Sequence, residues 1–444
     1  MVLLVALAGR NNPLIPLLKV NFDTFNLLHR WIGRIVILEA IAHTCAWAVN
    51  AFAARGSNNA MEGVLKDQFL FWGAVGTVAM MIIAIQSSSP LRHAFYETFI
   101  HLHQFLAFMT ILGVYVHLEV SNLPALPYIR TAVGLWAGDR FLRVARLIYL
   151  NVSRRKGCTT VSVKALQGEA CRVTFHLPRR VIIKPGSHVY IYVPRISGWM
   201  SHPFSVAWTD TDSEPYTGQR SSSPAIPESP GSIEKFQNST REESTSTSVS
   251  LIIQARTGFT RKIYEKACIA PNNTLNLTGL VEGPYSGHDS LSSYGTVLLF
   301  AGGAGITHHL VQIRHLIACA SAGTVATRRI VLVWSVKTVD QLAWVQPWMD
   351  EILSMEGRRE MLRIRLFVTK PRNPNEIRSP STTVQMMAGR CQPGVVMDAE
   401  LPSRIGATAV SVCGPGAFTD EVRHAVRERL HIGSLDFLEE AFTW

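Results

Sequence analysis

Two pairs of histidines with one spacing constrain this 444-residue chain more than any other feature. His29 and His43 stand fourteen positions apart, and so do His103 and His117. At about 100° per residue, fourteen helical steps end about 40° from a whole number of turns, so each pair shares one helical face. The rise of about 21 Å fits inside a hydrocarbon core of about 30 Å. Each pair therefore predicts a membrane helix with one histidine toward each surface.

Four apolar segments are close to the length of about 20 residues that a membrane helix needs. They are Trp31–Phe52, Gln68–Gln86, Phe95–Val120 and Ile129–Leu150. Sequential spans alternate in direction, so the first and third run parallel. His29 then lies level with His103, and His43 lies level with His117. We expect an α-helical membrane bundle over residues 1–152.

Neutral imidazole is an axial ligand of haem iron, so the two levels predict two stacked bis-histidine haem sites. A single membrane histidine is more simply a packed, hydrogen-bonded polar residue, but two pairs at one spacing favour ligands. His101 is excluded as an alternative to His103, because it lies about 160° from His117 around the helix. The expected metal ligands are therefore His29, His43, His103 and His117.

The positions of the positive charges behind the net charge of +11 indicate membrane topology rather than a nucleic-acid-binding surface. We therefore expect no nucleic-acid partner. Basic residues flank the apolar segments, and such residues are retained on the cytoplasmic side. They include Arg30, Arg34, Arg92, Arg140, Arg143, Arg146, Arg154, Arg155 and Lys156. This orientation makes His29 and His103 the inner pair and His43 and His117 the outer pair. The seven cysteines show no paired spacing, which predicts neither a disulfide framework nor a zinc site.

From about Gly157 the pattern changes to short strands separated by turns. We expect strands at Thr159–Leu166, Cys171–Leu177, His188–Val193 and Ser250–Ala255, forming a β-barrel over residues 153–288. A tract rich in Ser, Pro, Thr and Glu interrupts it and predicts a disordered insertion at about 210–248. After Tyr294 strands alternate with helical sequence, which predicts a parallel sheet with helices on both faces over residues 289–444. Its expected strands are Thr296–Phe300, Ile330–Val336, Arg363–Val368 and Ala409–Val412.

Two motifs in the barrel region are suited to a flavin. The segment His202, Pro203, Phe204, Ser205 is expected to form a sharply turned polar edge that offers a hydroxyl and backbone groups. Gly258 and Thr260 are expected nearby, because a glycine lets backbone N–H groups approach a pyrophosphate. Glu282-Gly283-Pro284-Tyr285 is expected to be the turn that ends the barrel.

Two glycine-rich turns in the α/β region are suited to a dinucleotide. In a glycine turn between a buried strand and a helix, the exposed backbone N–H groups bind phosphates. The first of the two turns precedes Thr307. The second turn follows the last expected strand, at the edge where such sheets bind ligands. The residues of these turns are Gly302, Gly303, Gly305, Cys413, Gly414 and Pro415. Cys413 would border the nicotinamide ring, although a lone buried cysteine is also an ordinary packing residue.

Taken together, these motifs resemble the fungal ferric reductase transmembrane components, within the superfamily that includes the NADPH oxidases. The likeness covers essentially the whole chain, from LAGRNNPL through HPFS, AGGAGIT and VCGPG to the C-terminal EEAFTW. It implies a ferredoxin-reductase-like cytosolic half with an FAD barrel and an NADPH-binding α/β domain, at a membrane domain holding two b-type haems. It also implies a C-terminal aromatic over the flavin, for which both Phe442 and Trp444 qualify.

The resemblance implies an integral protein of the plasma membrane that passes electrons from cytosolic NADPH through FAD and both haems to an extracellular ferric chelate. A superoxide-forming NADPH oxidase uses the same route with oxygen as the acceptor and stays an alternative. The family has six core spans and four are readable, so the chain is expected to lack the N-terminal spans. A truncated, inactive family member is therefore a third alternative. Lys337, after its strand, would meet a 2′-phosphate or is an ordinary surface lysine.

Overall fold

The computed structural model describes residues 1–439 apart from 19, 21, 199, 212–245 and 287–289, and it divides into two compact units. The first is built from Met1–Arg146 and the second begins at Leu147. The unit border falls within the last membrane-side helix, slightly before the domain border expected at residue 152. The expected flavin and nucleotide domains both lie in the second unit. The tract expected to be disordered lies mostly outside the described residues, but its ends at Asp210–Thr211 and Thr247–Ser248 are strand, so its expected bounds were too wide.

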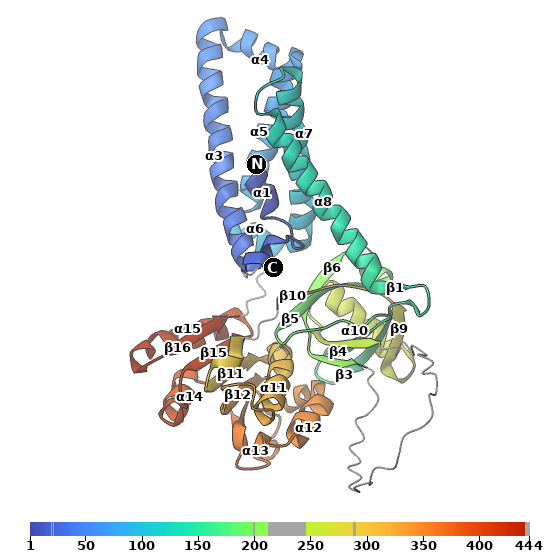
Figure 1. Ribbon diagram of the computed structural model, residues 1–444, viewed down its shortest axis with the longest axis vertical. Helices are drawn as coiled ribbons and strands as arrows, with labels where there is room; N and C mark the ends of the chain where they lie inside the picture. Colours follow the sequence, from blue (N-terminus) through green and yellow to red (C-terminus); the bar gives the residue numbers. More distant parts are fainter. Residues whose placement is uncertain (19, 21, 199, 212–245, 287–289, 440–444) are drawn as a thin grey trace, which may run out of the picture. The chain divides into compact units, whose positions relative to one another are not determined.

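The first unit consists of helices in the part of it that the structure describes (Figure 1). Three of them contain segments long and apolar enough to cross a membrane, at Thr24–Arg55, Gln68–Gln86 and Thr98–Val120. The helices are α1 (Val2–Ala6), α2 (Leu14–Leu18), α3 (Phe22–Arg55), α4 (Ser57–Lys66), α5 (Gln68–Gln86), α6 (Ser89–Ala94), α7 (Tyr96–Val120) and α8 (Leu126–Asn151). The first expected span was too short at its N-terminal end, because α3 starts before His29.

The fourth expected span, Ile129–Leu150, is helical but does not qualify as an apolar span among the described residues. Charged side chains recur along α8, and an ionised group is costly at membrane depth. These side chains are Arg130, Asp139, Arg140, Arg143 and Arg146. Within the described residues, the membrane part therefore has three apolar candidate spans and one long helix of mixed character.

Helices α5 and α7 approach each other through glycine. A Cβ added to Gly113 would lie 2.8 Å from the backbone nitrogen of Gly76 and 2.9 Å from the carbonyl oxygen of Trp72. Small residues at such crossings allow two membrane helices to pack backbone to backbone. Helix α3 is linked to α5 by a hydrogen bond of 3.1 Å between the hydroxyls of Thr44 and Thr77.

The flavin-side part of the second unit contains two antiparallel sheets and a small hairpin of β1 (Val152–Ser153) and β2 (Gly157–Cys158). One sheet has the order β7-β8-β4-β3-β9, and the other has the order β10-β5-β6. The strands are β3 (Thr160–Leu166), β4 (Ala170–Leu177), β5 (Ser187–Tyr192), β6 (Ser201–Ser205), β7 (Trp208–Thr211), β8 (Thr247–Gln254), β9 (Thr274–Thr278) and β10 (Leu280–Ser286). Apolar side chains of both sheets and of α10 (Phe259–Ile269) form one core.

Two expected turns of this region are strands instead. His202–Ser205 lies in β6, an edge strand paired antiparallel with β5. Glu282–Tyr285 lies in β10, which also pairs with β5 and bulges between Glu282 and Tyr285. The prediction of turns was therefore wrong at both places, because proline and glycine are tolerated at sheet edges and bulges.

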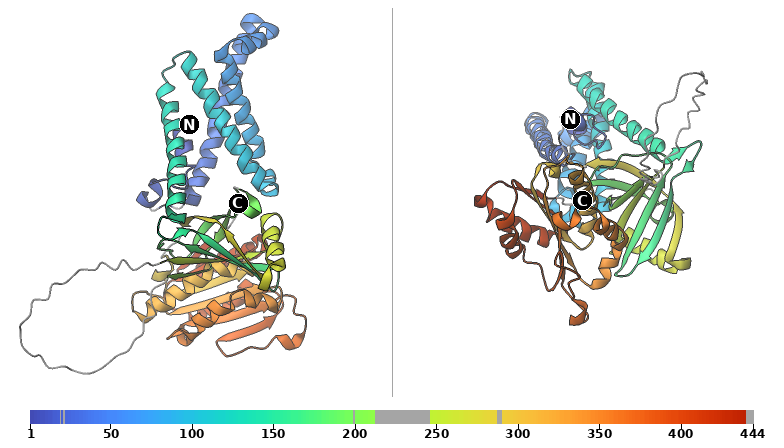
Figure 2. Two further views of the ribbon diagram at one scale, coloured as in Figure 1. Left: turned by 90° about the vertical axis from the view of Figure 1, so that its right-hand side faces the viewer. Right: turned by 60° about the horizontal axis from the view of Figure 1, so that its bottom comes forward.

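The nucleotide-side part is the expected parallel sheet (Figures 1 and 2). Its strand order is β14-β13-β12-β11-β15-β16. Its strands are β11 (Thr296–Gly302), β12 (Arg329–Val336), β13 (Leu362–Val368), β14 (Val384–Ala388), β15 (Thr408–Cys413) and β16 (Leu435–Glu439). Helices α11 (Ile306–Ser321) and α12 (Gln346–Ser354) share one core with the sheet. Helices α14 (Pro393–Glu400) and α15 (Gly416–Arg427) share the other, so both faces are covered as expected.

A stack of two tryptophans, each in contact with an arginine, joins the two parts of the second unit. Trp208 of β7 and Trp348 of α12 stack with ring centres 5.9 Å apart at 11°. The Arg314 guanidinium lies 4.0 Å above Trp208, and the Arg172 guanidinium lies 4.6 Å above Trp348. Arg172 also donates to the carbonyl oxygen of Trp344 at 3.1 Å. Cation–π and stacking contacts thus hold the flavin-side sheet against α11 and α12.

Candidate functional site

The structure brings together the expected inner pair of histidines. The rings of His29 on α3 and His103 on α7 have centres 6.3 Å apart with an interplanar angle of 70°. His29 donates through Nδ1 to the carbonyl oxygen of Leu4 at 2.9 Å. Nδ1 of His103 lies 3.4 Å from the amide nitrogen of Gln86. In both rings the contact is made by Nδ1, but only His29 donates through it, which leaves Nε2 of His29 available as a ligand, whereas the Gln86 amide donates to Nδ1 of His103.

The outer pair is arranged differently. His117 donates through Nδ1 to the carbonyl oxygen of Phe69 at 2.8 Å, and its ring stacks on the Phe69 ring at 3.9 Å and 22°. A Cβ added to Gly73, one turn further along α5, would lie 2.8 Å from the same Nδ1. His43 is exposed on α3, and within the described residues it has no ring contact with His117. The structure therefore seats His117 on α5 without bringing His43 to it.

The inner histidines fit a haem by distance and by their partners. An imidazole nitrogen binds a metal at about 2 Å, so two imidazoles on opposite sides of one ion have ring centres about 6 Å apart. The separation of His29 and His103 matches that arrangement. Ligating histidines commonly donate their other ring N–H to a backbone carbonyl, as His29 and His117 do. The donor set thus suits bis-histidine ligation at the inner level, and His117 is prepared in the same way at the outer level.

The expected flavin motif lies on β6 beside the start of α10. The imidazole of His202 stacks on the Phe259 ring, with centres 4.2 Å apart at 9°, and Phe204 contacts the same ring at 6.3 Å. Burial lowers the pKa of His202 to about 4, so the imidazole is neutral at neutral pH. Its Nε2 is buried and has no hydrogen-bond partner among the described residues. Pro203 pairs with Tyr190 and Ser205 pairs with His188 in the ladder between β6 and β5.

The start of α10 provides the second part of the flavin site. Gly258 adopts φ 59°, a conformation that favours glycine, and precedes the first residue of the helix. The Thr260 hydroxyl accepts from the backbone nitrogen of Arg256 at 3.0 Å and donates to the carbonyl oxygen of Thr257 at 3.0 Å. These bonds shape the loop whose backbone N–H groups point out of the helix N-terminus. Such a terminus is suited to a pyrophosphate, and the stacked His202 lies beside it.

The two glycine turns meet where the order of the parallel sheet reverses. The chain adds β12, β13 and β14 on one side of β11 and then crosses to add β15 and β16 on its other side. A Cβ added to Gly305 would lie 2.0 Å from the carbonyl oxygen of Cys413, and one added to Gly302 would lie 2.6 Å from Cδ of Pro415. A Cβ on Gly414 would lie 3.0 Å from the backbone nitrogen of Gly302. A reversal of this kind opens a crevice at the carboxyl ends of the strands, where α/β sheets bind nucleotides.

The other residues predicted to bind the nucleotide lie at the ends of strands or at the turn before α11. Gly303 adopts φ 55°, and the Thr307 hydroxyl donates to the carbonyl oxygen of Ala304 at 2.9 Å, so both shape the turn before α11. Cys413 is buried at the end of β15. Lys337 is exposed after β12, as both of its interpretations require. Phe442 and Trp444 lie outside the described residues.

A buried carboxylate on the flavin side was not predicted from the sequence. Glu282 is 1% exposed and accepts hydrogen bonds from the hydroxyls of Tyr285 at 2.8 Å and Tyr192 at 2.5 Å. His188 and Tyr190 pack against Tyr285, with ring centres 5.9 and 5.8 Å away. The alternation of His188, Tyr190 and Tyr192 along one strand is the signal that identifies this polar face of β5.

A polar network crosses from α11 to the sheet. His309 donates through Nε2 to the carbonyl oxygen of Phe300 at 3.1 Å, and its Nδ1 lies 3.3 Å from the side chain of Gln312. Gln312 in turn contacts Nε2 of His308 at 3.2 Å. Complete burial lowers the pKa of His309 to about 4 and keeps it neutral. The network fixes the first turns of α11, which carry the nucleotide turn.

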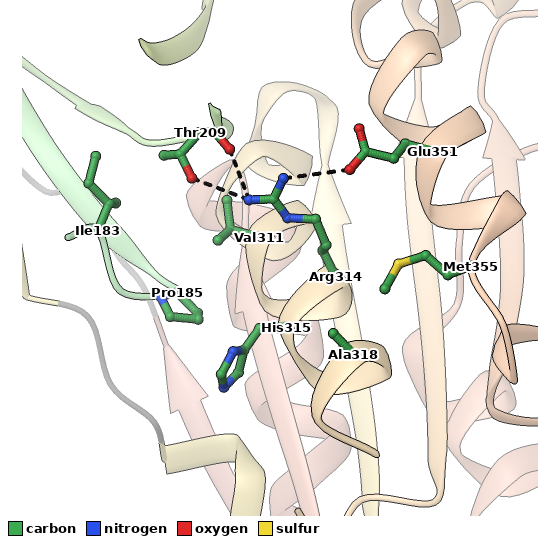
Figure 3. A pocket seen from close by; sticks show the side chains of 9 residues that line it. All are labelled: Ile183, Pro185, Thr209, Val311, Arg314, His315, Ala318, Glu351 and Met355. Carbon is green, nitrogen blue, oxygen red and sulfur yellow. Dashed lines mark hydrogen bonds and ion pairs between the residues drawn. The ribbon is translucent and has the colours of Figure 1, made fainter. Parts of the chain in front are cut away.

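A cavity of about 400 Å³ lies beside the arginine–tryptophan stack (Figure 3). Arg314 extends across it, donates to the carbonyl and hydroxyl oxygens of Thr209 at 3.0 and 3.2 Å, and lies 3.7 Å from Glu351. Ile183, Val311 and Met355 supply apolar walls. The polar groups of Arg314 are thus directed to protein partners, and no residue of the two glycine turns, before α11 and before α15, lines the cavity.

Three consecutive segments of the chain match described families. Residues 1–114 match the ferric reductase like transmembrane component, residues 155–215 match an FAD-binding domain, and residues 294–392 match the ferric reductase NAD binding domain. The order of the three matches is the order of the histidine pairs, the candidate flavin site and the candidate nucleotide site described above. The matches support FAD and a nicotinamide nucleotide as cofactors of the second unit.

The chain is also similar over its whole length to curated fungal proteins. It is 23% identical to the probable ferric reductase transmembrane component of Candida albicans, covering 100% of this chain and 63% of that protein. It is 25% identical to ferric/cupric reductase transmembrane component 2 of Saccharomyces cerevisiae, covering 100% of this chain and 59% of that protein. The chain thus spans less than two thirds of the length of these relatives. A solved ferredoxin reductase in carbazole 1,9a-dioxygenase is similar at 16% identity and a TM-score of 0.38, over 63% of this chain and 68% of that one.

Proposed function

The chain belongs to the family of ferric reductase transmembrane components, and we propose that it carries electrons from NADPH across a membrane to an extracellular ferric chelate. The observation that carries this proposal is the inner histidine pair, whose spacing suits one haem. The second observation is its place in one chain with flavin and nucleotide sites. In this proposal the flavin and nucleotide sites provide the electrons, and the inner histidine pair holds their acceptor within the membrane.

Each site has a defined part in this proposal. The glycine turns around Gly305 and Gly414 hold the dinucleotide, and Cys413 borders its nicotinamide. Strand β6 and the α10 N-terminus hold the flavin, with His202 supplying a neutral imidazole. When bound, NADPH would supply a hydride, FAD would accept it, and two b-type haems would carry single electrons. One NADPH then reduces two Fe(III) to two Fe(II), with release of NADP⁺ and one proton.

Groups of the protein orient the histidines and cover the flavin in this proposal. Leu4 and Phe69 hold the Nδ1 hydrogens of His29 and His117, which fixes the tautomer that ligates through Nε2. His103 faces His29 across the bundle, and His43 completes the outer level of the proposal. Phe442 or Trp444 covers the flavin. We propose that α8 forms the fourth span, with its charged side chains facing protein or headgroups, and that the second unit is cytosolic at the plasma membrane.

A second candidate function uses oxygen as the acceptor and releases superoxide. Its support is that it needs the same nucleotide, flavin and histidines as the first. The acceptor at the outer level decides between the two, and the similarity to ferric and ferric/cupric reductases favours metal.

Cells that express the full chain test the proposal directly. We expect NADPH-driven Fe(III) reduction, no matching superoxide, and a reduced b-type haem spectrum in their membranes. His103→Ala is expected to abolish the inner haem and the activity. His101→Ala is the matched control, because His101 is exposed on the same helix two residues away. Absence of haem despite a haem supply would refute electron transfer through the bundle, and superoxide without iron reduction would favour the oxidase.

A further inference from the structure

Three segments of the second unit meet where α8 ends. They are the last turn of α8, the β1–β2 hairpin and the loop 178–186 that leads into β5. Arg179 of the loop donates to the carbonyl oxygen of Val152 at 3.4 Å, and its guanidinium lies 4.4 Å above the Tyr149 ring. The loop of the flavin-side sheet is therefore attached to the end of the helix that leaves the membrane part.

This meeting point exposes large apolar side chains. Ile148 is 57% exposed and Tyr149 61% exposed on α8, Val152 is 41% exposed on β1, and Ile182 of the loop is 80% exposed. Scattered single apolar residues are normal on a protein surface. Here, however, the four apolar side chains come from segments that Arg179 links. Exposed apolar residues that lie in a group mark a surface that a membrane or another molecule covers.

The same segments carry positive charge and no negative charge. Residues 147–158 and 178–186 contain no Asp or Glu. They contain six basic residues, which are Arg154, Arg155, Lys156, Arg179, Arg180 and Lys184. Basic clusters next to a membrane helix are attracted to the negatively charged headgroups of anionic lipids. Apolar side chains beside them enter the boundary between headgroups and acyl chains, where tyrosine is also favoured.

We propose that this amphipathic patch, formed by Ile148, Tyr149, Val152 and Ile182 with the six basic residues, rests in the anionic phospholipid surface of the membrane. Ile182 enters the interface, and Arg154, Lys156 and Arg180 contact lipid phosphates. The patch thereby gives the flavin-side sheet a membrane contact of its own, in addition to its covalent link through α8. A nucleic acid would be attracted by the charge alone, but it would leave Ile182 uncovered.

Hydrogen exchange of the full-length chain in lipid nanodiscs tests this proposal. In nanodiscs of phosphatidylcholine with phosphatidylserine, we expect amides of the hairpin and of the loop 178–186 to exchange more slowly than in phosphatidylcholine alone. High salt is expected to reduce the difference, because exposed charges are screened beyond a Debye length of about 3 Å at 1 M. Ile182→Ser and Arg180→Glu are expected to remove the protection, without altering the exchange of the parallel sheet.

Ile269→Ser is the matched control, because Ile269 is 86% exposed at the end of α10 and lies outside the patch. It is expected to leave the protection intact. Equal exchange in both lipids would overturn the proposal. So would protection by inorganic phosphate or by an RNA oligonucleotide added to phosphatidylcholine nanodiscs, since either result would show a response to charge without a lipid surface. None of these outcomes depends on haem content or on electron transfer.

Discussion

The imidazole of His117 is held twice by one residue, Phe69. Its Nδ1 donates to the Phe69 carbonyl oxygen at 2.8 Å, and its ring stacks on the Phe69 ring at 3.9 Å. Phe69 itself is held by Asp67, whose carboxylate accepts from the Phe69 backbone nitrogen at 2.9 Å at the start of α5. The orientation of the expected outer ligand on α7 is thus set by the first turn of a different helix.

Gly73→Ala tests this seat. The added Cβ would lie 2.8 Å from His117 Nδ1, so the imidazole must move away from Phe69. We expect loss of about one of the two proposed haems, measured as haem per protein, because only the outer level depends on this contact. Gly134→Ala on α8 is the control, since nothing lies within 4 Å of its added Cβ. Equal haem content in both variants would contradict the role of the seat.

Gly305→Ala tests the junction of the two glycine turns. Its Cβ would lie 2.0 Å from the Cys413 carbonyl oxygen, so β11 and β15 must separate at their carboxyl ends. We expect NADPH affinity to fall by at least about tenfold, equivalent to about 1.4 kcal/mol, while FAD content is retained. Fluorescence titration and flavin content measure the two effects. Gly416→Ala in the following helix should bind normally, because its Cβ meets open space.

Trp208→Ala tests the joint between the two parts of the second unit. Trp208 is 1% exposed and lies between Arg314 and Trp348 in the stack. Removing a buried tryptophan costs about 3–5 kcal/mol, and we expect a corresponding loss in the free energy of unfolding. Since Trp348 loses its partner in the same step, Trp208→Ala and Trp348→Ala together should cost less than the sum of the single variants. Additive effects in thermal or denaturant unfolding would show that the stack is not a coupled unit.

His309 predicts a dependence of stability on pH. Its folded-state pKa is about 4, below the unfolded value of 6.5, so the unfolded chain binds more protons between these values. Stability from this group is fully present above about pH 6.5 and is lost as the pH falls toward 4. We expect a loss of about 1 kcal/mol between pH 7.5 and 5.5, absent in His309→Gln. If His309→Gln loses as much stability between pH 7.5 and 5.5 as the unsubstituted chain, the loss arises from other groups.

The strands that were predicted share one property, which is an interior position in a sheet. Strands β3, β4, β5, β8, β11, β12, β13 and β15 all have neighbours on both sides. The strands that were missed or interpreted as turns, β6, β7, β9, β10, β14 and β16, are all sheet edges. An edge strand is short and tolerates proline, glycine and polar residues, so its sequence carries a weaker apolar pattern.

The sequence by itself determined the helical phase of His29 with His43 and of His103 with His117, the interior strands and the glycine turns, because these follow from spacing along a few turns or strands. The pairing of His103 with His29 was predicted as well, from the alternating direction of the spans. Only the tertiary structure decided that Phe69 and Gly73 seat His117 and that His43 stays exposed. It alone revealed the stack of Trp208 on Trp348. Those partners lie far apart in the chain, and the pairing of distant residues depends on how whole helices and sheets pack.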